Sequence, residues 1–320
     1  MQPKYCQFIQ SGINFHLDCI KFCNQINMGP IISEYNDYIT ADEIEKIRQK
    51  YIDDFSKGIV YPKCVGCSFL KDKKHLSEKI DYFEIFHWHN CNCGCIYCAN
   101  LDITKGKFSD KVERGNPVVL KLLKEMYAKD MISKDNIWIG FGGGEVTVLK
   151  EFPKFIDLFL ENQANNIYIQ SSGITYSKTI EKALKSGKAY LQICVAAGSR
   201  EVYKKIKRRD KYNQVVNHIK KYLKAAKIKE NVISKYIIYA PYNSSAEEIK
   251  KWLDTAHNIG VKKVELSMEF CHSHAKKRGQ KVEQYYYDLF DYAKKYSKEI
   301  EIEFIHNYVS KELMEAGVHS

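Results

Sequence analysis

The sequence predicts an α/β protein built on a parallel sheet. From Tyr82 onward, short apolar runs typical of buried strands alternate with longer stretches whose apolar residues recur at helical spacing. Strands separated by helices of ten or more residues indicate parallel pairing with right-handed crossovers. About six βα units are too few to close an eightfold barrel. Residues 1–75 follow neither pattern and hold five of the eleven cysteines, which predicts a small module there.

Composition narrows the class of protein. A chain of 320 residues, 45% of them hydrophobic, can form one large domain with a full core and a small appendage. It contains no run of eighteen apolar residues, and its first residues lack the basic and apolar segments of a signal peptide. We therefore expect a cytoplasmic protein without a membrane span, whose eleven cysteines bind metal rather than form disulfides.

The N-terminal segment contains three recognisable elements. Residues 8–22 predict a short hairpin with turn signals at Ser11-Gly12 and Asp18. Residues 41–55 keep an apolar face at helical spacing, and Thr40 is placed to cap that helix. The run GIVYPKCVGC then carries a C-x2-C pair on a loop.

The rest of the chain alternates strand and helix. The first strand begins at Tyr82 and ends in four closely spaced cysteines. Active residues are expected where such strands end. Further strands are predicted at 137–141, 166–171, 190–195, 235–239, 263–268 and 301–305, and helices at 117–131, 152–160, 179–186, 215–226, 246–258 and 282–296.

The cysteine run is the most informative stretch. Cys91, Cys95 and Cys98 have the spacing C-x3-C-x2-C, with Cys93 as a spare between them. Structural zinc usually takes four ligands in two separated pairs, whereas iron–sulfur clusters use thiolates on one loop. Three thiolates would leave a fourth iron open, which favours catalysis. Zinc binding and a plain electron-transfer cluster remain alternatives.

With the aromatic Tyr97 before its last cysteine, this run resembles the cluster motif of the radical S-adenosylmethionine (SAM) enzymes. The resemblance implies a partial (βα)6 TIM-like barrel over residues 79–320. It also implies that Cys91, Cys95 and Cys98 hold a catalytic 4Fe–4S cluster, with SAM on the open iron. Reductive cleavage of SAM would then give a 5′-deoxyadenosyl radical that abstracts a hydrogen atom from the substrate.

Further family motifs follow the cysteine run. The run GFGGGEVT resembles the family's "GGE" motif, which implies that Gly142, Gly143, Gly144 and Glu145 hold the amino group of SAM. A valine replaces the proline that usually follows the glutamate. Tyr97 is counted with the cofactor-binding residues.

Two later stretches are expected to contact SAM. By position, Ser171 and Ser172 could contact its carboxylate or ribose, although a satisfied turn explains them equally well. The run ICVAAGSREVYKKIKRRD resembles "SLDAGTRETYxKIRG", with Cys194 for the serine and Ala196 for the aspartate. Residues 207–209 lie where relatives place an arginine for the SAM carboxylate, and Arg208 is the preferred candidate among them.

The first 78 residues resemble the auxiliary-cluster modules of the SPASM and Twitch type. The order of Cys6, Cys23, Cys64 and Cys67 matches their ligands, which implies a second 4Fe–4S cluster, with Cys19 as a spare. Asn24 replaces the second cysteine of a usual pair, and zinc or reduced thiols remain alternatives. We therefore expect an auxiliary module at 1–78 and the barrel at 79–320.

Other features allow more than one interpretation. Residues 200–229 carry twelve Lys or Arg against two acids, as either a solvated helix face or an attractor of an anionic substrate. His87 and His89 are expected in the core or behind the ligands. Cys271, His272 and His274 could bind zinc or touch substrate, or Cys271 could donate a hydrogen atom.

The predicted function is an oxidoreductase-type radical SAM reaction, with a peptide or protein as the favoured substrate. A carrier-linked or nucleotide sugar, or another small anionic metabolite, is the alternative within this family. An iron–sulfur electron carrier without catalysis is the alternative of another class. The resemblance also implies an electron donor such as flavodoxin or ferredoxin. No membrane partner is expected, and nucleic acid is disfavoured.

Overall fold

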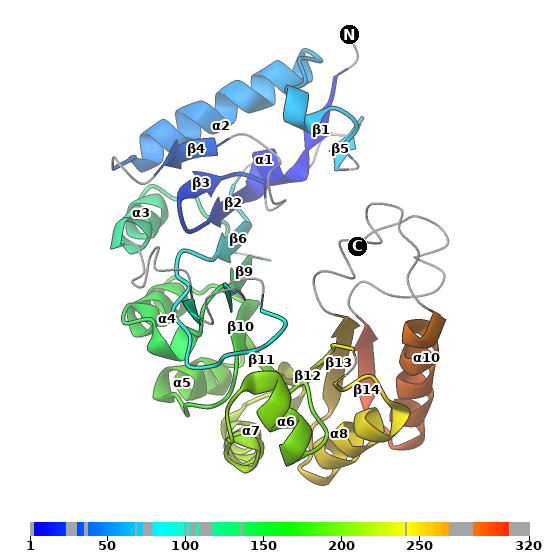
Figure 1. Cartoon of the computed structure of the whole chain (residues 1–320). Helices are drawn as coiled ribbons and strands as arrows, with labels where there is room; N and C mark the ends of the chain where they lie inside the picture. The colour runs from blue at the N-terminus through cyan, green and yellow to red at the C-terminus, as the bar shows by residue number, and fades with distance from the viewer. Residues whose placement is uncertain are drawn as a thin grey trace. The chain divides into compact units, whose positions relative to one another are not determined.

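The protein folds into two compact units in a computed structural model (Figure 1). One unit comprises Met1–Asn90 and Lys111–Tyr168, and the other Cys91–Asp110 and Ile169–Ser320. The strand β10 (Ile167–Ser171) carries the chain from the first unit into the second. The structure describes residues 3–23, 31–34, 38–67, 69–72, 79–98, 101–102, 107–108, 117–134, 137–240, 242–268 and 284–306.

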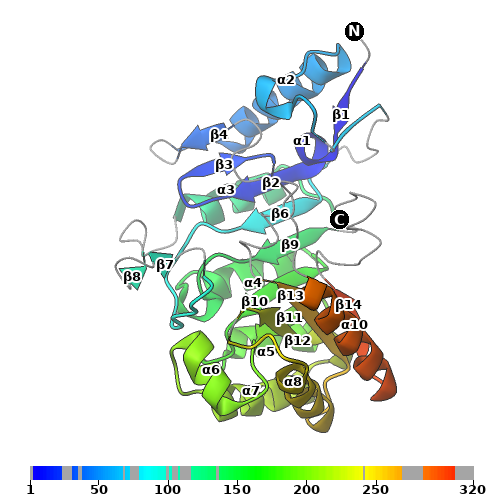
Figure 2. The same ribbon diagram turned by 45° about the vertical axis from the view of Figure 1, so that its right-hand side comes forward.

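The sheet of the first unit mixes parallel and antiparallel strands. Its members follow one another across the unit (Figure 2). The strands β9, β6 and β2 pair in parallel, and β3 and β4 continue the sheet antiparallel. In this order they are β9 (Trp138–Phe141), β6 (Tyr82–Ile85), β2 (Gly12–Phe15), β3 (Cys19–Lys21) and β4 (Ile31–Glu34).

Two expectations for the N-terminal segment have opposite outcomes. The expected helix with its Thr40 cap is confirmed, because Thr40 Oγ1 accepts from Glu43 N at 3.3 Å and Glu43 Oε2 accepts from Thr40 N at 2.8 Å. The expected turn at Ser11-Gly12 is wrong, since a short helix ends there, and β2 and β3 alone form the hairpin. The other elements of this unit are α1 (Gln7–Ser11), α2 (Ala41–Ser56), α3 (Pro117–Ala128), α4 (Phe152–Glu161), β1 (Tyr5–Cys6), β5 (Leu70–Lys71), η1 (Pro62–Cys64) and η2 (Val146–Val148).

Aromatic packing holds the first unit together. Phe141 of β9 lies 6.0 Å from the ring centroids of both Phe155 and Phe159 on α4. Phe15 of β2 stacks on Phe83 of β6 at 6.3 Å. These rings are almost fully buried, so each removes a large apolar area from water. The N-terminal segment is therefore packed into the same sheet as β6.

The second unit is a parallel α/β arrangement. The strands β11 (Ala189–Cys194), β12 (Val232–Ile238), β13 (Lys263–Met268) and β14 (Glu303–His306) lie side by side in this order, all parallel. Serine side chains cap α5, α6 and α8. The remaining elements are α5 (Lys178–Ser186), α6 (Arg200–Lys207), α7 (Tyr212–Ala225), α8 (Ala246–Asn258), α10 (Gln284–Glu299), β7 (Leu101–Asp102), β8 (Lys107–Phe108) and η3 (Lys229–Asn231).

The expected alternation of strand and helix is confirmed along both units. The strand predicted at 263–268 has those bounds in β13, and most of the others agree within three residues. The short helix α6 was not predicted as a separate element. No helix in the described ranges is long and apolar enough to cross a membrane. The division at residue 78 stays a prediction.

Candidate active site

The cysteine loop, residues 91–98, lies against the end of α6 in the second unit. The backbone N–H of Gly94 donates to the carbonyl of Lys207 at 3.1 Å. The N–H of Ile96 donates to the carbonyl of Ile206 at 3.0 Å. The last carbonyls of a helix have no partner within it. The loop therefore donates hydrogen bonds to two of these carbonyls, and these bonds hold the loop against the end of α6.

The thiols of this loop differ in exposure. Cys91, Cys95 and Cys98 are part-exposed, whereas Cys93 is 1% exposed. The N–H of Cys93 donates to Cys91 Sγ at 3.4 Å. The pKa of Cys95 is lowered to about 5, mainly by a hydrogen bond from the Cys93 thiol and also by the charge of Lys207. This shift favours the thiolate of Cys95, which is the form that binds iron.

A buried lysine faces these thiols. Lys207 is 1% exposed, and its Nζ donates to Tyr97 Oη at 2.7 Å. Tyr97 Oη lies 3.2 Å from Cys194 Sγ. Burial opposes the charge on Lys207, but the neighbouring Cys194, Cys95 and Tyr97 outweigh it and raise the pKa of Lys207. No carboxylate within the described ranges forms an ion pair with this ammonium group.

A buried ammonium without a counter-charge is costly, so the surroundings of Lys207 favour an anionic group. Thiolates and an iron–sulfur cluster would supply that negative charge. Three part-exposed thiols on one loop beside a buried cation therefore fit a thiolate-held cluster. Among the residues that the structure describes, no three His, Cys, Asp or Glu side chains gather closely enough to hold a single metal ion.

Of the two serines at the end of β10, Ser172 supports the cysteine loop. Ser172 Oγ donates to Asn92 Oδ1 at 3.1 Å, and Asn92 Nδ2 donates to Thr175 Oγ1 at 3.1 Å. Ser171 Oγ accepts from the N–H of Gly173 at 3.0 Å. Both serines are buried. They thus shape a turn that anchors Asn92, and their expected contacts to SAM stay predictions.

In the first unit the glycine run lies against the chain that leads from β6 to the cysteines. The N–H of Gly144 donates to the carbonyl of Trp88 at 3.0 Å, and that of Glu145 to the carbonyl of Asn90 at 2.8 Å. Gly143 has φ +92°, and a Cβ there would lie 2.9 Å from the Trp88 carbonyl oxygen. A side chain at Gly143 would therefore not fit, because the backbone of the glycine run lies too close to the backbone at Trp88.

The carboxylate of Glu145 is buried next to this run. It is 3% exposed, and its Oε1 accepts from Thr147 N at 3.2 Å and from Thr147 Oγ1 at 2.9 Å. It thereby caps the short helix η2. Its expected contact to the amino group of SAM stays a prediction.

The buried cation beside the cysteine loop is Lys207, whereas the preferred candidate Arg208 is exposed. Arg208 is exposed and ends α6 at φ +52°, in the left-handed region that favours glycine. Aligned on Gly198, the family run "KIRG" places its arginine on Lys207 and its glycine on Arg208. Counting along the motif would have found Lys207. A role for Arg208 in SAM binding stays a prediction.

The N-terminal cysteines are partly gathered in the first unit. Burial is the main cause that raises the pKa of both Cys6 and Cys64, and Cys67 adds to it in each case. The N–H of Cys67 also donates to the Cys64 carbonyl at 3.1 Å. Three of the four expected ligands thus interact. Cys23 and the expected spare Cys19 are buried as well.

The histidines have separate outcomes. His87 is fully buried, and its ring lies 5.5 Å from that of Trp88 and 5.7 Å from that of Phe155. Burial lowers the pKa of His87 to about 3, so the ring is neutral. This agrees with the core interpretation. The group of Cys271, His272 and His274 lies outside the described residues.

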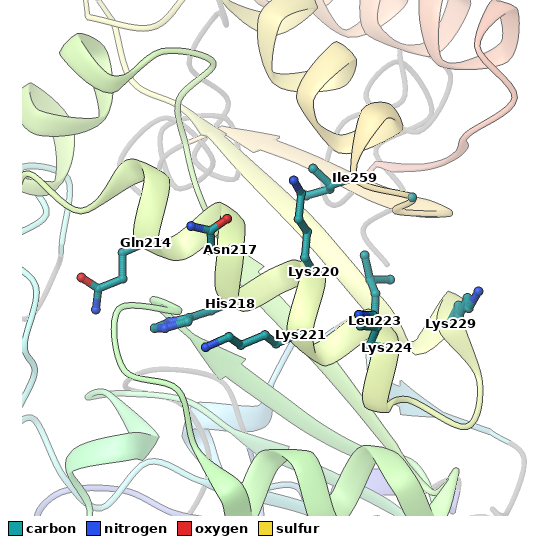
Figure 3. Close-up of a pocket in the computed structure, with 10 residues that line it drawn as sticks. Gln214, Asn217, His218, Lys220, Lys221, Leu223, Lys224, Lys229 and Ile259 are labelled. Atoms are coloured by element: carbon teal, nitrogen blue, oxygen red, sulfur yellow. The ribbon is translucent and has the colours of Figure 1, made fainter.

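Part of the basic stretch lines a pocket beside α7 (Figure 3). The pocket has a volume of about 820 Å³. Lys220, Lys224 and Lys229 line it, are exposed, and form no ion pair with an acid that the structure describes. The Nδ1–H of His218 donates to the Gly173 carbonyl at 2.9 Å. This surface is strongly positive.

Structures of Streptococcus suis SuiB share this fold. The crystal structure of Streptococcus suis SuiB bound to precursor peptide SuiA matches with a TM-score of 0.56 at 11% identity, over 89% of this chain and 57% of SuiB. SuiB bound to SAM matches with a TM-score of 0.53 at 12% identity, over 85% of this chain and 58% of SuiB. A radical SAM methyltransferase from Sphaerobacter thermophilus gives a TM-score of 0.48 at 12% identity, over 74% and 67% of the two chains.

The matches to SuiB cover only part of that protein, at low sequence identity. The chain spans less than two thirds of the length of SuiB, and at such low identity the likeness shows the fold alone. No curated protein sequence matches the chain. The expected fold class, α/β with the parallel sheet of a partial TIM-like barrel, is confirmed. The separate N-terminal module stays a prediction.

The family itself is shown by sequence. The family model described as "Radical SAM superfamily" matches residues 85–256, more than half of the chain. The match includes the cysteine loop, the glycine run and the basic helix α6. The chain therefore belongs to the radical SAM superfamily.

Proposed function

We propose that this enzyme holds a 4Fe–4S cluster through Cys91, Cys95 and Cys98 and abstracts a hydrogen atom from a peptide or protein substrate. The observation that supports this most directly is Lys207, a buried cation whose neighbours are thiols and a phenol. Such a cation needs an anionic group beside it, and a thiolate-held cluster provides one.

The residues of the site have separate tasks in this proposal. The three thiolates of the loop would hold the cluster. The cluster would supply one electron for the reductive cleavage of SAM to methionine and a 5′-deoxyadenosyl radical. Lys207 and Tyr97 place a positive charge and a hydroxyl next to Cys95. Asn92, tied to Ser172, keeps the loop in position.

The remaining expected contacts to SAM complete the proposal. The backbone of residues 142–144 and the carboxylate of Glu145 would bind its amino group. Ser171, Ser172 and Arg208 would contact its carboxylate or ribose. Lys207 is buried whereas Arg208 is exposed, so Lys207 is the better candidate for the carboxylate. Arginine and lysine both complement a carboxylate, although only arginine binds it through two parallel bonds.

A peptide or protein is the proposed substrate. The structure of SuiB, which shares the fold, contains a precursor peptide, and this supports the choice. A carrier-linked or nucleotide sugar, or another small anionic metabolite, is the alternative. An electron carrier without catalysis would need neither the glycine run nor an open iron. Cleavage of SAM would therefore distinguish such a carrier from an enzyme that acts on either substrate class.

The decisive experiment is SAM cleavage by the anaerobically reconstituted protein with dithionite. We expect 5′-deoxyadenosine from the wild type and none from Cys95→Ala, because the cluster would lose one of its three thiolates. Cys93→Ala is the matched control and should keep activity. A Cys95→Ala variant that still cleaves SAM would overturn the assignment.

We further propose a second 4Fe–4S cluster on Cys6, Cys23, Cys64 and Cys67. The charge of Cys67 contributes to the raised pKa values of both Cys6 and Cys64, and this supports the proposal because such an effect requires these three thiols to be neighbours. Reconstitution should then give about eight irons per chain. A variant without the three loop cysteines should retain about half of them. If that variant bound no iron and the wild type carried zinc, this second cluster would have to be dropped.

A further inference from the structure

The outward side of the end of α6 carries a dense positive charge. Residues 204–211 contain six Lys or Arg and one acid, Asp210. Lys204, Lys205, Arg209 and Lys211 are exposed, and we name these four the α6 basic surface. Asp210 pairs with Arg200 at 2.7 Å. Within the described ranges no acid forms an ion pair with Lys204, Lys205 or Lys211, so their charge is available to a partner.

The α6 basic surface adjoins the cysteine loop directly. Arg209 Nε donates at 3.0 Å to the carbonyl oxygen of Asn92, the residue between Cys91 and Cys93. A methyl group at Gly94 would lie 3.5 Å from Cβ of Arg208. A protein that binds to this surface therefore contacts Arg209, which is hydrogen-bonded to the backbone between two cysteines of the loop.

The cations at the end of α6 fall into two groups. Lys207 is buried and meets Tyr97 Oη, whose other neighbour is Cys194 at the end of β11. The α6 basic surface is exposed instead. A partner on the α6 basic surface therefore reaches the cysteine loop through Arg209 without touching the buried Lys207.

We propose that the α6 basic surface docks an acidic one-electron carrier protein that reduces the cluster. This inference rests on the proposed function, because SAM cleavage consumes one electron for each turnover. The electron passes from the reduced carrier to the cluster, and the carrier leaves oxidised by one electron. Opposite charges steer such encounters and raise association rates, an effect that salt weakens.

The lysines beside α7 provide a matched control. Lys229 opens η3, which precedes the first residue of β12, whereas Cys194 ends β11. Because β11 and β12 are parallel, these two positions lie at opposite ends of the strands. Lys220, Lys224 and Lys229 are exposed like the α6 basic surface but lie away from the cysteine loop. Replacing these three lysines by glutamate changes the net charge of the protein by the same amount as replacing three lysines of the α6 basic surface.

The experiment compares two reductants for the reconstituted enzyme, dithionite and reduced flavodoxin, an acidic flavin protein. The variant Lys204→Glu/Lys205→Glu/Lys211→Glu should keep the dithionite-driven rate of SAM cleavage. Its flavodoxin-driven rate at low carrier concentration should fall by about tenfold or more, because three favourable charges become unfavourable. The wild-type flavodoxin rate should fall with salt, and the variant rate should not.

The control variant Lys220→Glu/Lys224→Glu/Lys229→Glu should keep both rates. An equal loss of the flavodoxin-driven rate in both variants, or a loss in neither, would overturn the docking site. Binding of flavodoxin, measured by calorimetry, separates this result from a failure of the proposed function. If the wild type did not cleave SAM with dithionite, calorimetry would still show whether flavodoxin binds through the α6 basic surface.

Discussion

The carboxyl group of Glu84 gives a stability prediction with a defined sign. Glu84 lies in β6 between the fully buried Phe83 and Ile85, and faces away from both. Its Oε1 accepts from Tyr82 Oη at 2.6 Å. It is opposite Gly140 in the pairing of β6 with β9. Burial raises the pKa of Glu84 from 4.5 to about 7, and the bond from Tyr82 offsets only part of this.

The magnitude follows from the two pKa values. Between pH 4.5 and about 7, folded Glu84 binds a proton that the unfolded chain has lost. The free energy of unfolding therefore falls as pH rises through this window and stays constant above it. Each pKa unit corresponds to about 1.4 kcal/mol, so the charge of Glu84 costs about 3 kcal/mol above pH 7.

The substitution Glu84→Gln removes this cost and keeps an acceptor for Tyr82. We expect the variant to be about 3 kcal/mol more stable than the wild type at pH 8 and nearly equal to it near pH 4.5. Urea unfolding of the anaerobically reconstituted protein across this pH range measures the difference. Glu34→Gln, at an exposed position of β4, should show no such difference. A Glu84→Gln variant less stable than the wild type at pH 8 would refute the reasoning.

Three further predictions concern the cap, the buried lysine and the surface charge. Thr40→Ala should cost about 1 kcal/mol of stability in urea unfolding, because α2 loses its capping box, and an unchanged midpoint would contradict this. Lys207→Met should lower the reduction potential of the cluster by about 60 mV or more in a titration followed by electron paramagnetic resonance, while Lys207→Arg should keep it. If residues 200–229 attract an anionic substrate, its KM should rise steeply with salt, whereas a flat response indicates a solvated helix face.

Local pattern predicted most of the elements because their signals are contained in a few neighbouring residues. The apolar run of β13 and the capping box of α2 both agree with the structure. Two local predictions were less successful. At Gly12 a helix ends where a hairpin turn was expected. The helix α6 was not predicted, since only Tyr203, Ile206 and Lys207 are buried among its charged residues.

Pairing between distant segments could not be predicted in the same way. Gly12–Phe15 lies in register with Tyr82–Ile85, which joins the N-terminal segment to the first barrel strand. Nothing in either run specifies the other, because a strand's pattern fixes which face is buried and not which strand it joins. The boundary expected at residue 78 therefore came from cysteine content and from the resemblance alone.

The sequence by itself determined the family, because the spacing of Cys91, Cys95 and Cys98 and the glycine run are chemical requirements held in short stretches. Only the tertiary structure decided which cation is buried beside the cysteine loop. Lys207 and Arg208 are adjacent and carry the same charge, yet the end of α6 buries the first beside Tyr97 and exposes the second. Burial and hydrogen-bond partners depend on segments far apart in the chain, here 110 residues for Lys207 and Tyr97, and no local pattern encodes them.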